Sequence, residues 1–218
     1  INNEHELAID ERKVHMEENM IITISRQYGS GGSQVAKILA ERMGVWCYDR
    51  DILTIAAERI GNEELTEDTI NDLNYKRNDV ASAGITGVMG MGNIPIYNQM
   101  FLEQAKIIRK LANYGSAVFL GRCADYILKD IKNCTSVYLY ADREFRKNRV
   151  KEIYGSNAEI MDKEEKNRAD YYNYYTGNRW GDINNYDFAI NTSKVSFEEA
   201  ADLIYRFAKD KQKNLKDR

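Results

Sequence analysis

A glycine-rich turn at residues 26–33 is the part of this sequence whose residue types and spacing most directly suggest chemistry. Residues 21–39 read ITISRQYGSGGSQVAKILA, an apolar run followed by the turn and by a stretch with helical spacing. A strand that passes through such a turn into a helix directs backbone N–H groups and the helix N-terminus at one place, which favours an anion. Gly29, Gly31 and Gly32 allow a tight turn and a close approach of that anion. The stretch therefore predicts a phosphate-binding loop, with a purely structural strand-to-helix turn as the alternative.

The loop departs at two positions from the phosphate-loop pattern GxxxxGK[ST]. Arg26 replaces the first glycine and Gly32 replaces the lysine, whereas Ser33 falls where the last residue of the pattern would hold Mg²⁺. Arg26 stands at the start of the loop and could reach back over the phosphates, so we expect it to supply the positive charge lost at Gly32. Lys37, one turn into the helix, is the weaker candidate for that role.

A dinucleotide-binding turn is the rival interpretation of the same residues. Gly29-Ser30-Gly31 matches the start of a G-x-G-x-x-G fingerprint, and Asp49 follows about 20 residues later, where a ribose-binding acid would stand. The third glycine position, however, holds Gln34. A dinucleotide-dependent oxidoreductase is therefore the less favoured hypothesis.

Four arginines further along the chain favour phosphoryl transfer. Arg122 follows an expected strand at its carboxyl end, where ligands gather in α/β sheets. Arg146 and Arg149 are three residues apart and share one helix face, and Arg168 follows in a later helical stretch. Phosphoryl transfer needs positioned cations, whereas hydride transfer has no evident need of them. The alternative is that Arg146 and Arg149 form weak surface ion pairs with nearby acids, namely Glu144, Glu152 or Glu159.

Short apolar runs alternate with stretches of helical spacing over most of the chain. This alternation predicts an α/β fold with a five-stranded parallel sheet that helices cover on both faces. The expected strands are residues 20–25, 45–48, 117–120, 136–140 and 186–190. The expected helices are residues 33–43, 51–60, 142–154, about 159–175 and 196–212, with a further amphipathic segment from Pro95 to about Tyr114.

The expected organisation is a single domain at residues 20–215, preceded by a charged N-terminal extension at residues 1–19. Residues 62–94 are either a flexible connector or a mobile insert that covers the substrate. Residues 171–180 contain four tyrosines and a tryptophan, which could stack on a base or a sugar. We favour packing within the domain or at a dimer face for this segment.

Composition excludes several classes of protein. The 218 residues suffice for one well-buried domain, and no apolar stretch reaches the roughly 18 residues that a membrane span needs. The net charge of -3 argues against a general nucleic-acid binder. The three cysteines lack metal-ligand spacing and indicate reduced thiols in a cytoplasmic protein. We expect nucleotide partners, no nucleic acid, no membrane, and a monomer or homodimer.

Several segments in order carry a resemblance to one family. They read ITIS, GSGGS, AKILAERMG, VFLGR, VYLYADREFRKNRV, KNRA and YDFAINTS. The sequence thereby resembles the cytidylate kinases, and more closely the divergent cytidylate kinase-like branch of the P-loop nucleoside monophosphate kinases, over about residues 20–210. The resemblance implies a P-loop kinase fold with a helical lid at about residues 155–180. It also implies ATP- and Mg²⁺-dependent phosphoryl transfer to a nucleoside monophosphate or a similar small phosphate-bearing acceptor.

The resemblance further implies roles for the matching residues. Arg122 would contact the acceptor, and Asp49 would lie near both magnesium and the acceptor. Arg146 and Arg149 fall at the base of the lid and Arg168 falls within it, where they would stabilise the transferring phosphoryl group. The implied nucleotide-binding residues are Gly29, Ser30, Gly31, Gly32 and Ser33 in the loop, with Ser33 also binding Mg²⁺, and Asn191 and Thr192 where the family wraps the ATP base.

The sequence also departs from the family's pattern. The loop lysine is Gly32, the two acids that flank Gly-Arg in the family are Leu120 and Cys123, and the first lid arginines are Met161 and Glu164. Most of these changes concern recognition of the acceptor. The alternative hypothesis is a catalytically inactive nucleotide-binding regulatory protein of the same fold.

Overall fold

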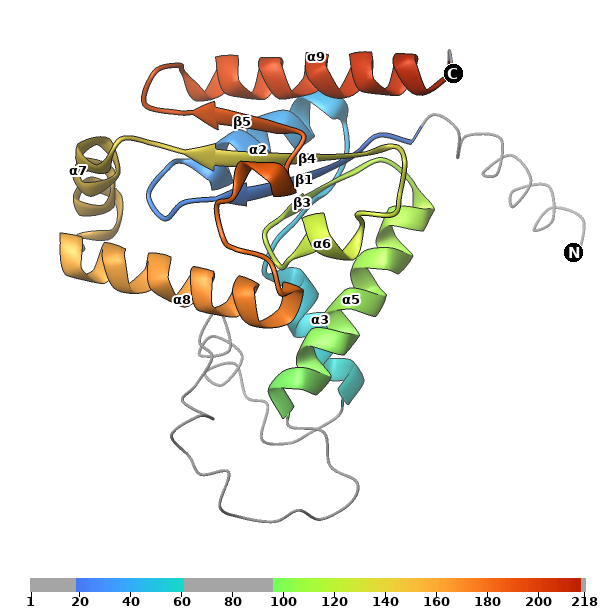
Figure 1. Ribbon diagram of the computed structural model, residues 1–218, viewed down its shortest axis with the longest axis horizontal. Coiled ribbons are helices and arrows are strands. Elements are labelled where there is room, and N and C mark those ends of the chain that lie inside the picture. The colour runs from blue at the N-terminus through green and yellow to red at the C-terminus, as the bar shows by residue number, and fades with distance from the viewer. Residues whose placement is uncertain (1–18, 61–95, 217–218) are drawn as a thin grey trace, which may run out of the picture.

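A five-stranded sheet forms the centre of the computed structural model, which describes residues 19–60 and 96–216 (Figure 1). The strand order is β2-β3-β1-β4-β5, and every neighbouring pair is parallel. The predicted five-stranded parallel sheet is therefore confirmed, whereas residues 1–18 of the expected extension and the expected insert lie outside the described residues. The strands are β1 (Ile21–Arg26), β2 (Cys47–Tyr48), β3 (Ala117–Leu120), β4 (Cys134–Tyr140) and β5 (Phe188–Asn191).

Two strands begin two residues later than the sequence predicted. Strand β2 starts at Cys47 and not at Val45, because the Val45 N–H donates to the Ala40 carbonyl (3.0 Å) and helps to close the preceding helix. Strand β5 starts at Phe188 and not at residue 186, because Tyr186 closes a short 3₁₀ turn through a bond to the Ile183 carbonyl (3.1 Å). Backbone groups committed to a cap or turn are not free to join the ladder.

Helices cover both faces of the sheet, as the sequence predicted. The α3 helix runs over residues 51–60, the limits expected from the sequence, and the helix that follows Pro95 ends at Tyr114. The short α6 turn was not predicted. The helices are α2 (Gly32–Met43), α3 (Asp51–Ile60), α5 (Ile96–Tyr114), α6 (Ala124–Ile127), α7 (Arg143–Tyr154), α8 (Ala158–Thr176) and α9 (Phe197–Lys216), with the 3₁₀ helix η2 (Ile183–Asn185).

Strand β1 is buried along its whole length and divides its side chains between two cores. Ile22 and Ile24 pack with residues of α2 and α9 on one face, and Ile21 packs with residues of α3, α5 and α6 on the other. Figure 1 shows α9 above the sheet and α3, α5 and α6 below it. A run of apolar residues buried on both sides is typical of a central parallel strand. The loop after β1 therefore leaves a rigid strand at the middle of the sheet.

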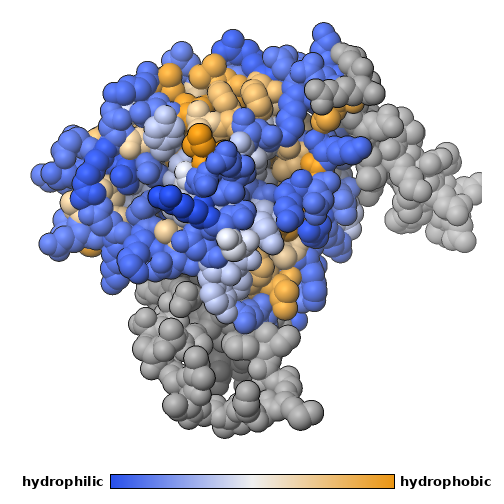
Figure 2. Space-filling view, in the orientation of Figure 1, coloured by the Kyte–Doolittle hydropathy of each residue, from blue (hydrophilic) through white to orange (hydrophobic). Residues whose placement is uncertain are grey.

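Helix α7 lies beyond the carboxyl ends of the strands, and α8 returns from it beneath the sheet (Figure 1). The face in Figure 2 is mostly hydrophilic, with smaller hydrophobic areas. Within the described residues, no helix combines the length and apolar character that crossing a membrane requires. The carboxyl end of the sheet, between β1, α7 and α8, is where the predicted site residues gather.

Candidate functional site

The loop that joins β1 to α2 requires glycine at two positions. Gly29 and Gly31 have φ values of 81° and 83°, in the left-handed region that disfavours residues with a Cβ. A Cβ atom would also lack space, because at Gly29 it would lie 2.8 Å from Cγ2 of Val150 and at Gly31 2.4 Å from the ring of Phe197. The loop is thus closely packed by α7 on one side and by the first residue of α9 on the other.

Most backbone groups of the loop are bonded to protein atoms. The Gln27 N–H donates to the Leu139 carbonyl (2.9 Å), and the Gln27 carbonyl accepts from both the N–H (3.2 Å) and the hydroxyl (2.8 Å) of Ser30. The Thr192 hydroxyl donates to the Ser30 carbonyl (2.7 Å). Among the described residues, the structure gives no acceptor to four N–H groups, those of Gly29, Gly31, Gly32 and Ser33. Donors left over at a helix N-terminus favour an anion.

A cavity of about 240 Å³ opens beside these four N–H groups. Four cationic side chains line it, and none of the described lining residues is acidic. The cations come from β1, α2, α7 and α8, so the fold brings together charges that lie far apart in the sequence. The lining residues are Arg26, Gln27, Tyr28, Gly29, Gly31, Gly32, Ser33, Gln34, Lys37, Arg149, Ile153, Tyr154 and Arg168.

Arg26 and Gly32 fit each other. The Arg26 side chain is only 7% exposed, and a Cβ atom on Gly32 would lie 2.7 Å from its Cβ and 2.6 Å from its Cγ. The stem of Arg26 thus fills the space where a side chain at position 32 would begin. The two departures from the phosphate-loop pattern are therefore one exchange, an arginine gained at position 26 and a side chain given up at position 32. Nη2 of Arg26 lies 3.7 Å from Oδ1 of Asp49, which follows β2.

Arg149 reaches the cavity from α7. Its guanidinium lies 4.8 Å from the centre of the Phe197 ring and donates to the side-chain carbonyl of Gln34. Partial burial lowers the pKa of Arg149. The described residues contain no ion pair of Arg149 with the acids that the alternative named, and Glu144 instead pairs with Lys147 (3.6 Å). Arg149 is therefore held toward the phosphate loop.

Arg146 has a different position from Arg149. It is 8% exposed, lies outside the cavity wall, and donates to the carbonyls of Ala141 (3.2 Å) and Tyr28 (3.4 Å). These hydrogen bonds hold the loop from the side that faces away from the cavity. The two arginines are three residues apart on α7, so their directions differ by about 60° around the helix axis, which is enough to separate a supporting position from a lining one.

Arg168 reaches the loop from α8. Its Nη1 donates to the Arg26 carbonyl (3.0 Å), and its guanidinium lies 5.0 Å from the centre of the Tyr28 ring. Tyr154 of α7 lies on the same loop residue, with its ring centre 5.9 Å from that of Tyr28. The predicted lid helix is thus in contact with the phosphate loop in this structure.

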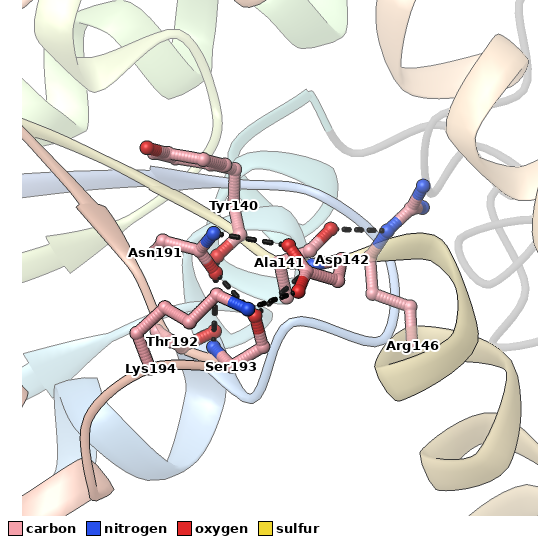
Figure 3. A network of polar contacts seen from close by, with 8 residues as sticks. All are labelled: Tyr140, Ala141, Asp142, Arg146, Asn191, Thr192, Ser193 and Lys194. Carbon is pink, nitrogen blue, oxygen red and sulfur yellow. Dashed lines mark hydrogen bonds and ion pairs between the residues drawn. The ribbon is translucent and has the colours of Figure 1, made fainter.

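Asn191 and Thr192, at the end of β5, belong to a polar network that ties two loops together (Figure 3). The Asn191 side chain donates to Asp142 (3.1 Å), and Lys194 forms an ion pair with the same carboxylate (2.6 Å). Hydrogen bonds from Lys194 and Asn191 lower the pKa of Asp142 to about 2. The Thr192 hydroxyl lies within 3.0 Å of the Tyr140 carbonyl and also donates to the phosphate loop, as described above. None of these side chains lines the cavity.

Arg122 also lies outside the cavity, in a strained turn at the carboxyl end of β3. Gly121, Arg122 and Cys123 have φ values of 73°, 60° and 55°, and a left-handed non-glycine residue costs about 1–3 kcal/mol. The Arg122 side chain is 2% exposed. Asp125 follows in α6, and burial raises the pKa of its carboxyl. The chain thus has an acid three residues after Arg122, although the flanking positions expected from the family lack one.

The tyrosine-rich segment packs within the domain. Tyr171 and Tyr172 are buried, and the Tyr172 hydroxyl donates to Asp125 (2.7 Å). The Trp180 ring lies edge-on to Tyr138, with ring centres 5.5 Å apart. Aromatic pairs of this kind stabilise a core beyond their buried area. Tyr171, Tyr172 and Trp180 therefore pack within the domain, as the favoured hypothesis expected.

Several residues at the site were missed by sequence reasoning. Tyr28 and Gln34 lie within or next to the loop, so their place in the chain was a usable signal. Glu165, which accepts a hydrogen bond from the Tyr28 N–H, and Phe197 had no signal, because they reach the loop only through tertiary packing. Lys37, the weaker candidate from the sequence, lines the cavity.

A parallel sheet with a phosphate loop between its central strand and α2 defines the class of P-loop kinase folds. The chain belongs to the cytidylate kinase-like family, whose profile matches residues 21–194, so the resemblance seen in the sequence is confirmed. The family and the fold support phosphoryl transfer as the general class of reaction.

Solved structures agree with this assignment. An uncharacterized protein from Eubacterium ventriosum ATCC 27560 shares 30% identity over 87% of this chain and 98% of its own, with a TM-score of 0.64. TT1252 from Thermus thermophilus (17% identity, 88% and 97% coverage, TM-score 0.54) shares the fold. Shikimate kinase from Acinetobacter baumannii in complex with shikimate also shares the fold (15% identity, 88% and 94% coverage, TM-score 0.51). No curated protein matched the chain.

Proposed function

We propose that this protein transfers a phosphoryl group from ATP, with Mg²⁺, to a nucleoside monophosphate or a similar small phosphate-bearing acceptor. The observation that carries the proposal is one cavity lined both by four cationic side chains and by four N–H groups for which the described residues provide no acceptor. A triphosphate matches such a site in charge and in hydrogen-bond demand. Catalysis would come from positioning and charge, with no covalent nucleophile.

The loop residues fit the donor. Gly29, Ser30, Gly31, Gly32 and Ser33 would hold its phosphates, and the Arg26 guanidinium would take the place of the lysine missing at position 32. When bound, ATP supplies the phosphoryl group and Mg²⁺ neutralises part of the phosphate charge. The described residues contain no cluster of three metal ligands, so Mg²⁺ would be held by the Ser33 hydroxyl together with the phosphates themselves.

The arginines of α7 and α8 would have two different roles. Arg149 and Arg168 would stabilise the transferring group from the cavity wall, and Arg146 would keep the loop in shape through its carbonyl contacts. Asp49 would orient the acceptor or a magnesium-bound water, and Arg122 would bind the acceptor. Asn191 and Thr192 would shape the donor side of the site.

One observation favours a second candidate, a nucleotide-binding regulatory protein without catalytic activity. Arg122, the arginine assigned to the acceptor, is buried and does not line the cavity beside the loop. A protein that binds ATP without a second substrate needs only the loop and its cations. Both candidates predict nucleotide binding, and only the first predicts turnover.

The deciding experiment measures ADP formation from MgATP with a panel of nucleoside monophosphates, and ATP affinity in parallel. Phosphoryl transfer to any member, abolished in Arg26→Ala at unchanged fold, supports the kinase. ATP binding without transfer to any acceptor supports the regulatory protein. A wild-type chain that binds no nucleotide contradicts both.

A further inference from the structure

The side chain of Glu165 joins three segments at the back of the phosphate loop. Its Oε2 accepts from the Tyr28 N–H at 2.6 Å, and its Oε1 accepts from the Trp180 indole N–H at 2.8 Å. Tyr28 belongs to the loop, Glu165 to α8, and Trp180 to the segment that follows α8. Hydrogen bonds to a carboxylate are roughly twice as strong as those between neutral groups. One carboxylate therefore uses both oxygens to hold the loop and the tryptophan against the same helix.

Glu165 shares a face of α8 with two other residues that reach the start of the loop. Arg168, one turn further, donates to the Arg26 carbonyl (3.0 Å). Tyr172, another turn on, donates to Asp125 (2.7 Å), whose other oxygen accepts from the hydroxyl of Ser25 (3.4 Å). The contacts follow the chain backwards from residue 28 to residue 25. Helix α8 is thus aligned with the end of β1 by three polar side chains.

We propose that Glu165 is a positioning residue of the phosphate site. It does not line the cavity, so it acts through Tyr28 and Arg168. Its bond to the Tyr28 N–H fixes the peptide between Gln27 and Tyr28, and with it the direction of the N–H groups that follow in the loop. Its bonds also hold α8 in the register in which Arg168 reaches the cavity. Donors fixed before the anion arrives need not be ordered by it.

The inference rests on the proposed function, because it assumes that the loop binds phosphate. The test is Glu165→Gln, with Glu159→Gln as the matched control, since Glu159 is an exposed residue in the first turn of the same helix. A glutamine side chain has one carbonyl oxygen and an NH₂ group, so only one of the two oxygen positions that the donors use can still accept. The variant keeps the size of the side chain and removes one acceptor and the charge.

The affinity of inorganic tripolyphosphate is measured by calorimetry, and the melting temperature by circular dichroism. We expect Glu165→Gln to bind tripolyphosphate about 10-fold more weakly, which corresponds to the loss of one charge-assisted bond. Glu159→Gln should stay within about 2-fold of the wild type. Binding by Glu165→Gln within 2-fold of the wild type overturns the positioning role while leaving the phosphate site intact. A wild-type chain that does not bind tripolyphosphate overturns the proposed function and this inference together.

A second readout separates positioning from simple loss of stability. The chain has two tryptophans, and Trp46 is 77% exposed, so Trp46→Phe leaves Trp180 as the single emitter. In that background, tripolyphosphate should shift the Trp180 emission, because Glu165 connects the loop to the indole. With Glu165→Gln added, the shift should disappear even at saturating tripolyphosphate. A shift of the same size in the presence and absence of Glu165 contradicts the connection.

Discussion

The fit between Arg26 and Gly32 predicts that Gly32→Ala destabilises the protein when residue 26 is arginine and stabilises it when residue 26 has no side chain. In the wild-type chain, Gly32→Ala places a Cβ atom 2.6–2.7 Å from the buried stem of Arg26, closer than real Cβ contacts come. Overpacking of this kind costs about 1–3 kcal/mol. The φ of Gly32 is not in the left-handed region, so alanine in the helix returns about 0.5–1 kcal/mol. The net expectation is a loss of about 0–2.5 kcal/mol of stability.

In an Arg26→Gly background the same Gly32→Ala substitution meets neither the Cβ nor the Cγ of residue 26. It should then stabilise the protein by about 0.5–1 kcal/mol, the helix-propensity gain alone. The coupling free energy between the two positions is therefore about 1–3 kcal/mol. Urea unfolding of the wild type, both single variants and the double variant, followed by circular dichroism, measures it directly. Effects that add within about 0.5 kcal/mol would refute the exchange and leave the missing lysine unexplained.

The same cycle extends to function. Arg26→Ala should lower phosphoryl transfer far more than it lowers stability, and Arg26→Gly with Gly32→Lys should recover part of the lost rate, because it rebuilds the ordinary phosphate-loop pattern. Gly32→Lys alone, with Arg26 in place, should not raise the rate above that of the wild type, since the Arg26 stem occupies the space that the lysine needs. A double variant no more active than Arg26→Gly would argue against Arg26 as the replacement cation.

Three further predictions follow from single contacts. Thr192→Val leaves the buried Ser30 carbonyl without its donor and should destabilise the protein by about 1–3 kcal/mol in urea unfolding, whereas Thr192→Ser should stay near the wild type. Asp162→Asn removes the exposed paired bond to Arg143 and should leave the midpoint of urea unfolding almost unchanged, and a clear fall in the midpoint would mean that α7 and α8 depend on this pair. Burial raises the pKa of Cys47 to about 11, so its labelling by a disulfide reagent should be slow at pH 8 and accelerate roughly 10-fold per pH unit toward pH 11, and a plateau below pH 9 would contradict the shift.

Local features of the structure were predictable from the sequence. The limits of α3 and the end of α5 agree with the predictions because apolar spacing, Gly and Pro act within a few residues. The start of β2 was wrong by two residues, because the cap of α2 competes with the ladder for the N–H of Val45. Such competition between neighbouring elements is invisible to a pattern that treats each element alone.

Cationic residues of the site were predictable from their charge, whereas the side of the loop that each side chain reaches was less predictable. Arg149 and Arg168 line the cavity as a cationic pattern suggested, whereas Arg146, on the same helix, turns to the backbone carbonyl of Tyr28. Glu165 was absent from every pattern, since an acid beside a phosphate loop runs against the charge rule. The Glu165 carboxylate contacts the loop from outside the cavity, and the packing of α8 determines on which side of the loop it lies.

The dependence of the loop on residues near the end of the domain has a consequence for synthesis on the ribosome. Chains fold from the N-terminus as they emerge, and residues 26–33 are among the first of this domain to appear. The Ser30 carbonyl, however, accepts its hydrogen bond from the hydroxyl of Thr192, and Gly31 packs against the ring of Phe197, and both partners are synthesised much later. The nascent chain therefore carries the loop sequence long before it has the shaped loop, which is complete only after Phe197, the first residue of α9, has left the exit tunnel.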